Sequence, residues 1–360
     1  MSPPQKDAKS ASKESRLLVL GVVSFYLVSA LAMVMANKWV LNTTTTPLFF
    51  LWTQLFIAAV LFIVTDSLRL LPDRLSFNLA TAKGLIPMVS LNVVGLSFSN
   101  YTLKYVDASF YQVARGLVLP FTVLTSFLFL KARPSLRIFL CCGLVTVGFF
   151  VGVFLDGTPI SLTGVGFGVA SSMITAVHSV VIKKSLGVVG GSALALSWYT
   201  NALSAVVLLP VLLLAGEGPD VVALLFGGGQ IVGTAKEAVA NHLSTFMWGS
   251  LITGVLGFLM SIASLLSIKV TSPITHMVSS AVRGVAASLL GMWLFHDIIT
   301  TGRASSIAII LFGSILYTWV KHQESQTPSK SKDSATVNGQ KYERVKPDDI
   351  EMGEKESTKH

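Results

Sequence analysis

Ten long apolar segments alternate with short polar segments between residues 17 and 322. A helix needs about 20 apolar residues to cross the hydrocarbon core of a bilayer, and each segment is about that long. A lipid-exposed segment must satisfy its own backbone hydrogen bonds, so each should be α-helical. The pattern predicts an all-α polytopic membrane protein with ten transmembrane helices at 17–37, 47–66, 84–104, 108–130, 136–155, 163–183, 193–214, 245–268, 273–295 and 303–322.

The segments outside the spans divide the chain into domains. Residues 1–16 and 323–360 are polar, without apolar periodicity, and are expected to be disordered tails around a ten-helix domain at 17–322. An even number of spans permits a five-plus-five inverted repeat, with halves at about 17–155 and 163–322. The span pattern supports this repeat better than residue identities between the halves do. The connection 215–244 is irregular and includes a short amphipathic segment.

Composition agrees with a membrane protein. Hydrophobic residues make up 52% of the chain and charged residues 12%, with a mean hydropathy of +0.68. A soluble domain usually carries about 25% charged residues. The net charge of +9 lies mainly in the tails and short loops, so it indicates membrane topology rather than a nucleic-acid partner. The adjacent Cys141 and Cys142 have neither disulfide nor metal-site spacing, and no cofactor or metal is expected.

The distribution of lysine and arginine predicts the orientation. Twelve of these residues lie in the N-terminal tail and in the second, fourth and sixth connections. The clear loops on the other side hold two, Lys236 and Arg303. Positive residues favour the cytoplasmic side of a membrane, so both termini are expected in the cytosol.

Several ionisable side chains lie inside the predicted spans, where they are costly and indicate function unless they reach the interface. No acidic residue lies deep in a span, so an anionic substrate would neutralise these cations. Arg115 lies about 10 Å into the fourth span and Arg283 about 15 Å into the ninth, which enters from the other face. Both arginines should therefore meet near the midplane. The other candidates are Lys38, Lys104, His178, Lys269 and His276.

Polar residues follow helical spacing around both arginines. In the ninth span, Lys269, His276, Ser279, Ser280 and Arg283 form one stripe, and Tyr111 shares a stripe with Arg115 in the fourth. A guanidinium fork suits a phosphate or diphosphate. The alternatives are snorkelling for the lysines, among them Lys38, and close helix packing for the serines.

Two further side chains in the seventh span, Tyr199 and Asn201, could stack on a base and read its edge. Equally, they could belong to an interfacial aromatic belt and a helix–helix hydrogen bond. No phosphate-binding loop, metalloprotease motif or metal spacing is present in the sequence, so no enzyme is expected and transport would run by exchange or on a gradient.

Several stretches resemble the triose-phosphate and nucleotide-sugar transporter branch of the drug/metabolite transporter clan. They are LKYVDASFYQVARGL (103–117) and LTSFLFLKARPS (124–135). The stretches most similar to the Golgi GDP-fucose transporter group are NKWVLN (37–42), KVTSPITHMVSSAVRG (269–284) and LYTWVK (316–321). The resemblance covers most of 17–322.

The resemblance implies ten helices, an inverted repeat, a Golgi membrane and exchange of a nucleotide sugar for a nucleoside monophosphate. The phosphate-binding cation of the family falls on Arg283. Its guanine-associated Phe-Tyr-Asn-Asn stretch falls on residues 198–201, where Trp198 and Thr200 depart from it. The Gly-Ala-Leu-Asn-Lys motif of GDP-mannose transporters is absent from the sequence.

Together these features favour GDP-fucose exchanged for GMP by alternating access. Arg115 and Arg283 would bind phosphate, Lys269 and His276 would support them, and Tyr199 and Asn201 would meet the base. A sugar-phosphate or triose-phosphate translocator and a non-transporting membrane scaffold are the alternatives. The expected partners are the nucleotide sugar, the monophosphate and the bilayer. The oligomeric state stays open, with a homodimer among the options.

Overall fold

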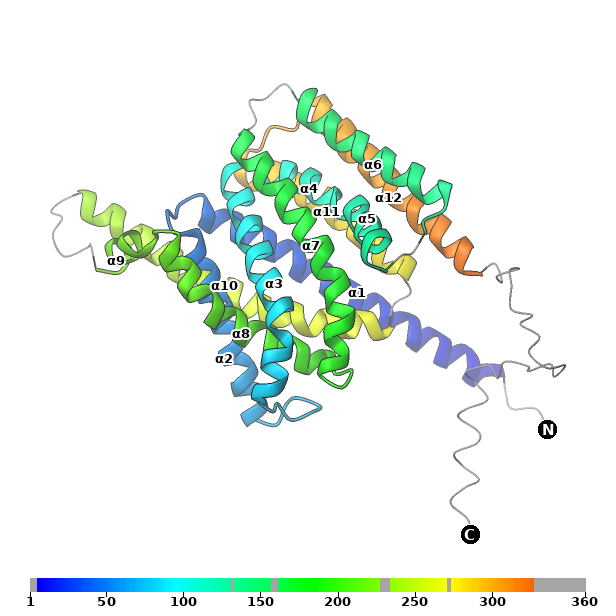
Figure 1. Cartoon of the computed structure of the whole chain (residues 1–360), viewed down its shortest axis with the longest axis horizontal. Coiled ribbons are helices and arrows are strands. Elements are labelled where there is room, and N and C mark those ends of the chain that lie inside the picture. Colours follow the sequence, from blue (N-terminus) through cyan, green and yellow to red (C-terminus); the bar gives the residue numbers. More distant parts are fainter. Residues whose placement is uncertain (1–4, 131–132, 157–160, 227–233, 271–272, 327–360) are drawn as a thin grey trace, which may run out of the picture. The chain divides into compact units, whose positions relative to one another are not determined.

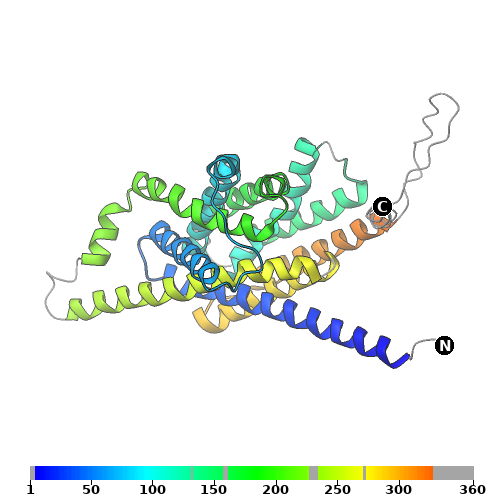
Figure 2. The ribbon, with the colours of Figure 1, turned by 90° about the horizontal axis from the view of Figure 1, so that it is seen from below.

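We describe the protein from a computed structural model, shown in Figures 1 and 2. The described backbone covers residues 5–130, 133–156, 161–226, 234–270 and 273–326, and side chains are described there except at 5–20, 130, 183, 234–241, 264–281 and 326. Every regular element in these ranges is a helix. The helices are α1 (Gln5–Leu41), α2 (Pro47–Ser67), α3 (Leu79–Tyr105), α4 (Ala108–Gly116), α5 (Val118–Leu130), α6 (Leu136–Phe154), α7 (Leu162–Val188), α8 (Ala193–Leu214), α9 (Gly218–Phe226), α10 (Thr234–Val270), α11 (Pro273–Phe295) and α12 (Thr301–Gln326).

The helices lie in one compact unit, Met1–His322, and Gln323–His360 forms a separate unit. Within the described residues, nine segments are long and apolar enough to cross a membrane. The predicted ninth span corresponds to α11, of which the described stretch Val282–Phe295 is apolar but shorter. The all-helical membrane fold is therefore confirmed, while ten spans and the inverted repeat remain predictions.

Large apolar side chains on the outside of the unit are consistent with a lipid environment. Phe154, Leu162 and Leu214 are 75%, 82% and 88% exposed. A soluble protein seldom presents such a continuous apolar surface. In a bilayer this surface costs nothing, because lipid chains cover it.

The fourth span is one segment by hydropathy but two helices in the structure. The first of them, α4, ends at Gly116, and Leu117 bonds back to Ala114 O with a three-residue spacing. The cause is Pro120 in the first turn of α5, because proline has no N–H to donate to the carbonyl four residues earlier. Helix α4 is thus a short separate segment that carries Arg115.

Two regions are more helical than the sequence predicts. Helix α1 begins at Gln5, within the tail for which disorder is expected; its Lys, Ala and Glu residues have high helix propensity and extend the first span. The connection 215–244 contains α9, which corresponds to the predicted short segment, and α10 begins at Thr234 rather than near residue 245.

Glycines allow α6 and α12 to pack closely, and the two helices lie side by side in Figure 1. A Cβ on Gly148 would stand 2.8 Å from Ile310 Cγ1 and 3.1 Å from the Ile310 backbone nitrogen. At Gly313, a Cβ would stand 2.7 Å from Val145 Cγ2. Helix pairs in membranes commonly use small residues in this way.

The order of the helices defines two faces of the domain. We call the face at which α1 begins and α12 ends the tail face, and the face at which α1 ends and α12 begins the opposite face.

At the opposite face, Glu217 precedes α9 and caps α2. Its carboxylate accepts hydrogen bonds from Leu48 N and Phe49 N, each 3.0 Å long, and from Tyr101 OH at 3.1 Å. A carboxylate at a helix N-terminus is electrostatically favourable.

Candidate functional site

The first arginine of interest, Arg115, is positioned by a tyrosine one turn earlier on α4. The Arg115 Nη1 atom donates a 3.0 Å hydrogen bond to Tyr111 OH, and its guanidinium lies 5.6 Å from the centre of that ring. The Tyr111 hydroxyl also pairs with Ser99 Oγ of α3 at 2.7 Å. The Arg115 side chain lies deep within the domain, among many protein atoms. Its surface is nevertheless accessible to solvent. It therefore borders an open space instead of filling the core.

The second arginine, Arg283, lies on α11, which packs against both α1 and α4. Its Nη1 donates a 3.3 Å hydrogen bond to Tyr26 OH of α1. The charge of Arg283 lies close enough to that of Arg115 to repel it, and Tyr26 and Tyr111 lie within electrostatic range of both arginines. The structure therefore brings the two predicted arginines together. We call Tyr26, Ser99, Tyr111, Arg115 and Arg283 the central cluster.

The central cluster is suited to binding an anion. Two like charges near each other inside a membrane domain are unfavourable until an anion lies between them. Each guanidinium offers several N–H donors in a planar fork, which matches the oxygens of a phosphate. The tyrosine hydroxyls hold the side chains in place. This arrangement predicts a phosphate or diphosphate as the ligand.

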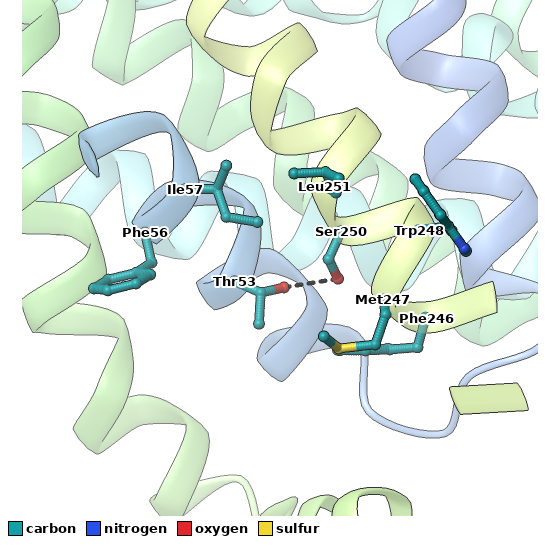
Figure 3. A pocket seen from close by; sticks show the side chains of 8 residues that line it. All are labelled: Thr53, Phe56, Ile57, Phe246, Met247, Trp248, Ser250 and Leu251. Atoms are coloured by element: carbon teal, nitrogen blue, oxygen red, sulfur yellow. Dashed lines mark hydrogen bonds between the residues drawn. The ribbon is translucent and has the colours of Figure 1, made fainter. Parts of the chain in front are cut away.

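An apolar groove elsewhere on the domain is a poor candidate for such a ligand. It lies between α2 and α10, has a volume of about 360 Å³, and Thr53 Oγ1 donates to Ser250 Oγ within it at 3.0 Å (Figure 3). Apart from that pair, its lining is Phe56, Ile57, Phe246, Met247, Trp248 and Leu251. No charged side chain and no member of the central cluster lines it.

Four predicted site residues lie outside the part of the chain whose side chains are described: Lys269, His276, Ser279 and Ser280. Three others are placed in protein contacts. The Tyr199 hydroxyl accepts from Asn78 N at 2.7 Å, and Asn201 Nδ2 donates to Ser197 O one turn earlier on α8 at 2.8 Å. The Lys38 Nζ atom donates to Leu103 O and Val106 O at the end of α3. Their proposed substrate roles stay predictions.

A second charged group lies at the opposite face around Arg303, which the sequence places in a loop. Arg303 is only 1% exposed and is the largest fully buried side chain among the described residues. Its guanidinium pairs with Asp107 at 2.7 Å and with Asp156 at 2.6 Å, and donates to Ser109 Oγ at 2.9 Å. Thr300 also donates to Asp156 Oδ1, at 2.8 Å. This arginine thus has carboxylate partners within the protein.

A comparison with protein families decides which one the chain fits. The sequence model of the triose-phosphate transporter family matches residues 16–318. The chain belongs to the triose-phosphate transporter family. The match contains all five residues of the central cluster and the whole of the Arg303 group. Members of this family are transporters, which agrees with the expectation that the chain is not an enzyme.

Individual relatives within this transporter family align over most of their length. A Drosophila melanogaster protein named "GDP-fucose transporter, Golgi" is 29% identical over 89% of this chain and 95% of its own length. Proteins named "GDP-fucose transporter 1" from Mus musculus and Monosiga brevicollis are 30% and 31% identical, over 95% and 90% of this chain. They span 94% and 95% of their own lengths.

Three residues of the two charged groups described above were not predicted from the sequence as site residues. They are Tyr26, Ser99 and Arg303. Tyr26 is a single polar residue in an apolar span, where an interfacial aromatic is the ordinary interpretation. Ser99 has the ordinary pattern of a helix-packing serine. A signal for Arg303 existed, because Asp107 and Asp156 both lie at span ends on the face to which Arg303 belongs.

Among the described residues, no group of three metal-ligating side chains occurs.

Proposed function

We propose that this chain is a nucleotide-sugar antiporter of the Golgi membrane, exchanging GDP-fucose for GMP by alternating access. The observation that carries the proposal is the approach of Arg115 and Arg283, from α4 and α11, within one cluster of the membrane domain. A transporter family match over residues 16–318 and relatives named as GDP-fucose transporters support it.

In the proposed complex, the two guanidinium groups bind the diphosphate of the nucleotide sugar or the phosphate of GMP. His276, Ser279 and Ser280, on the same face of α11 as Arg283, supply further contacts, and so does Lys269, which lies near the end of α10 and not on α11. Tyr199 and Asn201 meet the base. Lys38 would add positive charge from α1. Both termini lie in the cytosol, ten helices form two inverted halves, and a homodimer is compatible with this arrangement.

Exchange in proteoliposomes tests the proposal. Vesicles loaded with GMP should take up GDP-fucose through the parent protein. Arg283→Ala and Arg115→Ala should abolish uptake, because each loses charge-assisted hydrogen bonds of about 1.5–3 kcal/mol apiece. Arg283→Lys should retain partial uptake with weaker affinity, since it keeps the charge and loses the fork. Arg74→Ala is the matched control, because the Arg74 side chain is 62% exposed near the tail face.

The outcomes separate the proposal from its rivals. Exchange of inorganic phosphate or triose phosphate in preference to GMP would identify a sugar-phosphate translocator, which the family name also supports. A folded Arg283→Ala variant with parental uptake would place the substrate site elsewhere. Absence of any transported anion, together with lost partner binding in the arginine variants, would indicate a scaffold.

A further inference from the structure

The turn between α3 and α4, residues 103–109, lies at the opposite face and is held by three charged side chains. The first is Lys38, near the end of α1. Its ammonium donates to Leu103 O at 2.9 Å and to Val106 O at 2.7 Å, and the side chain is 6% exposed. A lysine at the C-terminal carbonyls of a helix is favoured by the helix dipole. Lys38 thereby fixes the end of α3.

The second side chain, Asp297, comes from the connection between α11 and α12. Its Oδ2 accepts a 3.0 Å hydrogen bond from Ala108 N, the first residue of α4, and the carboxylate also bonds the Ser109 backbone. Lys38 and Asp107 both lie within electrostatic range of Asp297. Asp297 thereby fixes the start of α4.

The third side chain is Arg303, at the start of α12. It pairs with Asp107 and bonds Ser109 Oγ, so it contacts the same turn that Lys38 and Asp297 contact. Its second carboxylate, Asp156, follows α6. Asp297 and Arg303 come from the C-terminal half of the chain, whereas the turn, Lys38 and Asp156 come from the N-terminal half. These bonds therefore connect the halves at one face.

Helix α4 connects the turn directly to the central cluster, because it carries both Tyr111 and Arg115. Tyr111 and Arg115 lie four and eight residues after Asp107, about 6 Å and 12 Å along α4. Helix α4 is bounded by the turn at one end and by the break at Leu117 at the other. Because α4 begins directly after the turn, a shift of the turn would also shift the side chains of Tyr111 and Arg115.

We propose that the α3–α4 turn is the gate of the opposite face, and that Lys38, Asp297 and Arg303 form the latch that keeps it closed. The latch must release whenever the opposite face opens. This inference rests on the alternating access proposed above. The latch is reversible because its bonds are electrostatic and local: the Asp107 side chain is 43% exposed, so water can replace its contact with Arg303.

Electron–electron distance measurements between two nitroxide labels test the latch. Labels at Tyr105→Cys on the turn and at Ile298→Cys beside Asp297 are accessible, since these positions are 45% and 65% exposed. The background carries Cys141→Ala and Cys142→Ala. The protein without latch substitutions should show a main short-distance population. Asp107→Asn keeps the side-chain shape and weakens the charge-assisted pair with Arg303, so the ratio of closed to open molecules should fall about tenfold.

The control is Arg74→Gln, which removes the 3.6 Å pair between Arg74 and Asp66 at the tail face and should leave the distances unchanged. Asp107→Asn should fold, because Arg303 keeps its second carboxylate partner, Asp156. A distance distribution that stays the same, or broadens without a second population, would overturn the gate. The measurement needs no substrate, so it succeeds or fails independently of the assignment to nucleotide-sugar exchange.

Discussion

The stability of the fold depends on the ion pairs of Arg303, because a fully buried guanidinium needs carboxylate partners to balance its charge. Removing one member of a buried ion pair costs about 3–5 kcal/mol, since the remaining charge is left without compensation. We expect Arg303→Ala to lower the melting temperature in detergent strongly. Arg303→Ala combined with Asp156→Ala should recover part of the loss, because the Asp156 carboxylate, itself 0% exposed, is removed as well. Equal melting temperatures for parent and single variant would contradict this account.

Asp297 gives the stability a specific pH dependence. Burial raises the pKa of its carboxyl group above the usual range, nearby Asp107 adds to the rise, and Lys38 partly opposes it. The folded state therefore favours the protonated carboxyl more than the unfolded state does. This contribution to stability is fully present below the ordinary carboxyl pKa of about 3.9 and is lost as the pH rises through the raised value.

Melting curves of the parent and of Asp297→Asn measure this contribution. The melting temperature of the parent minus that of Asp297→Asn should increase as the pH falls from 7 toward 4. Asparagine does not titrate and keeps an acceptor for Ala108 N, so the difference isolates the carboxyl group. A difference that is constant with pH, or that shrinks on acidification, would rule out the raised pKa.

At the scale of the elements, the contact between α6 and α12 can be tested by adding side chains to glycines. Gly148→Val should destabilise the protein by about 1–3 kcal/mol, the usual cost of overpacking. The reason is that even a Cβ there meets the Ile310 backbone, which cannot move aside easily. Gly143→Val lies on the same helix and meets nothing within 4 Å, so it should melt like the parent. Equal losses in both variants would mean that helix packing is not the cause.

The helices differ in how much their sequence reveals about them. Long apolar spans are recognisable because the bilayer imposes their length. Their positions agree with the structure to within a few residues, apart from the starts of α1 and α10. The break at Leu117 was predictable in principle from Pro120, but hydropathy averages over it. The contacts of Arg303 with Asp107 and Asp156 join residues 196 and 147 positions apart, and these depend on how helices pack. Local periodicity carries no information of that kind.

At the scale of the whole molecule, the asymmetry of positive charge predicts how the domain is inserted. Residues 69–74 should face the cytosol, whereas Ile298 should face the lumen, because cytoplasmic loops carry the excess of lysine and arginine. Single cysteines at Arg69 and Ile298, without Cys141 and Cys142, can be labelled with an impermeant maleimide in sealed Golgi vesicles. The Arg69→Cys variant should react from outside and Ile298→Cys only after permeabilisation. The reverse pattern would invert the topology.

The capping of α2 by Glu217 has a consequence for biosynthesis. The acceptor for the amide of Leu48 lies 169 residues further along the chain. At about 5–20 residues per second, a ribosome needs roughly ten to thirty seconds to make that stretch. During this interval the nascent second span enters the membrane with its first amides uncapped, and water or lipid headgroups must solvate them. Chains truncated before Glu217 would remain in that state permanently, so α2 receives its cap only in chains that extend beyond residue 217.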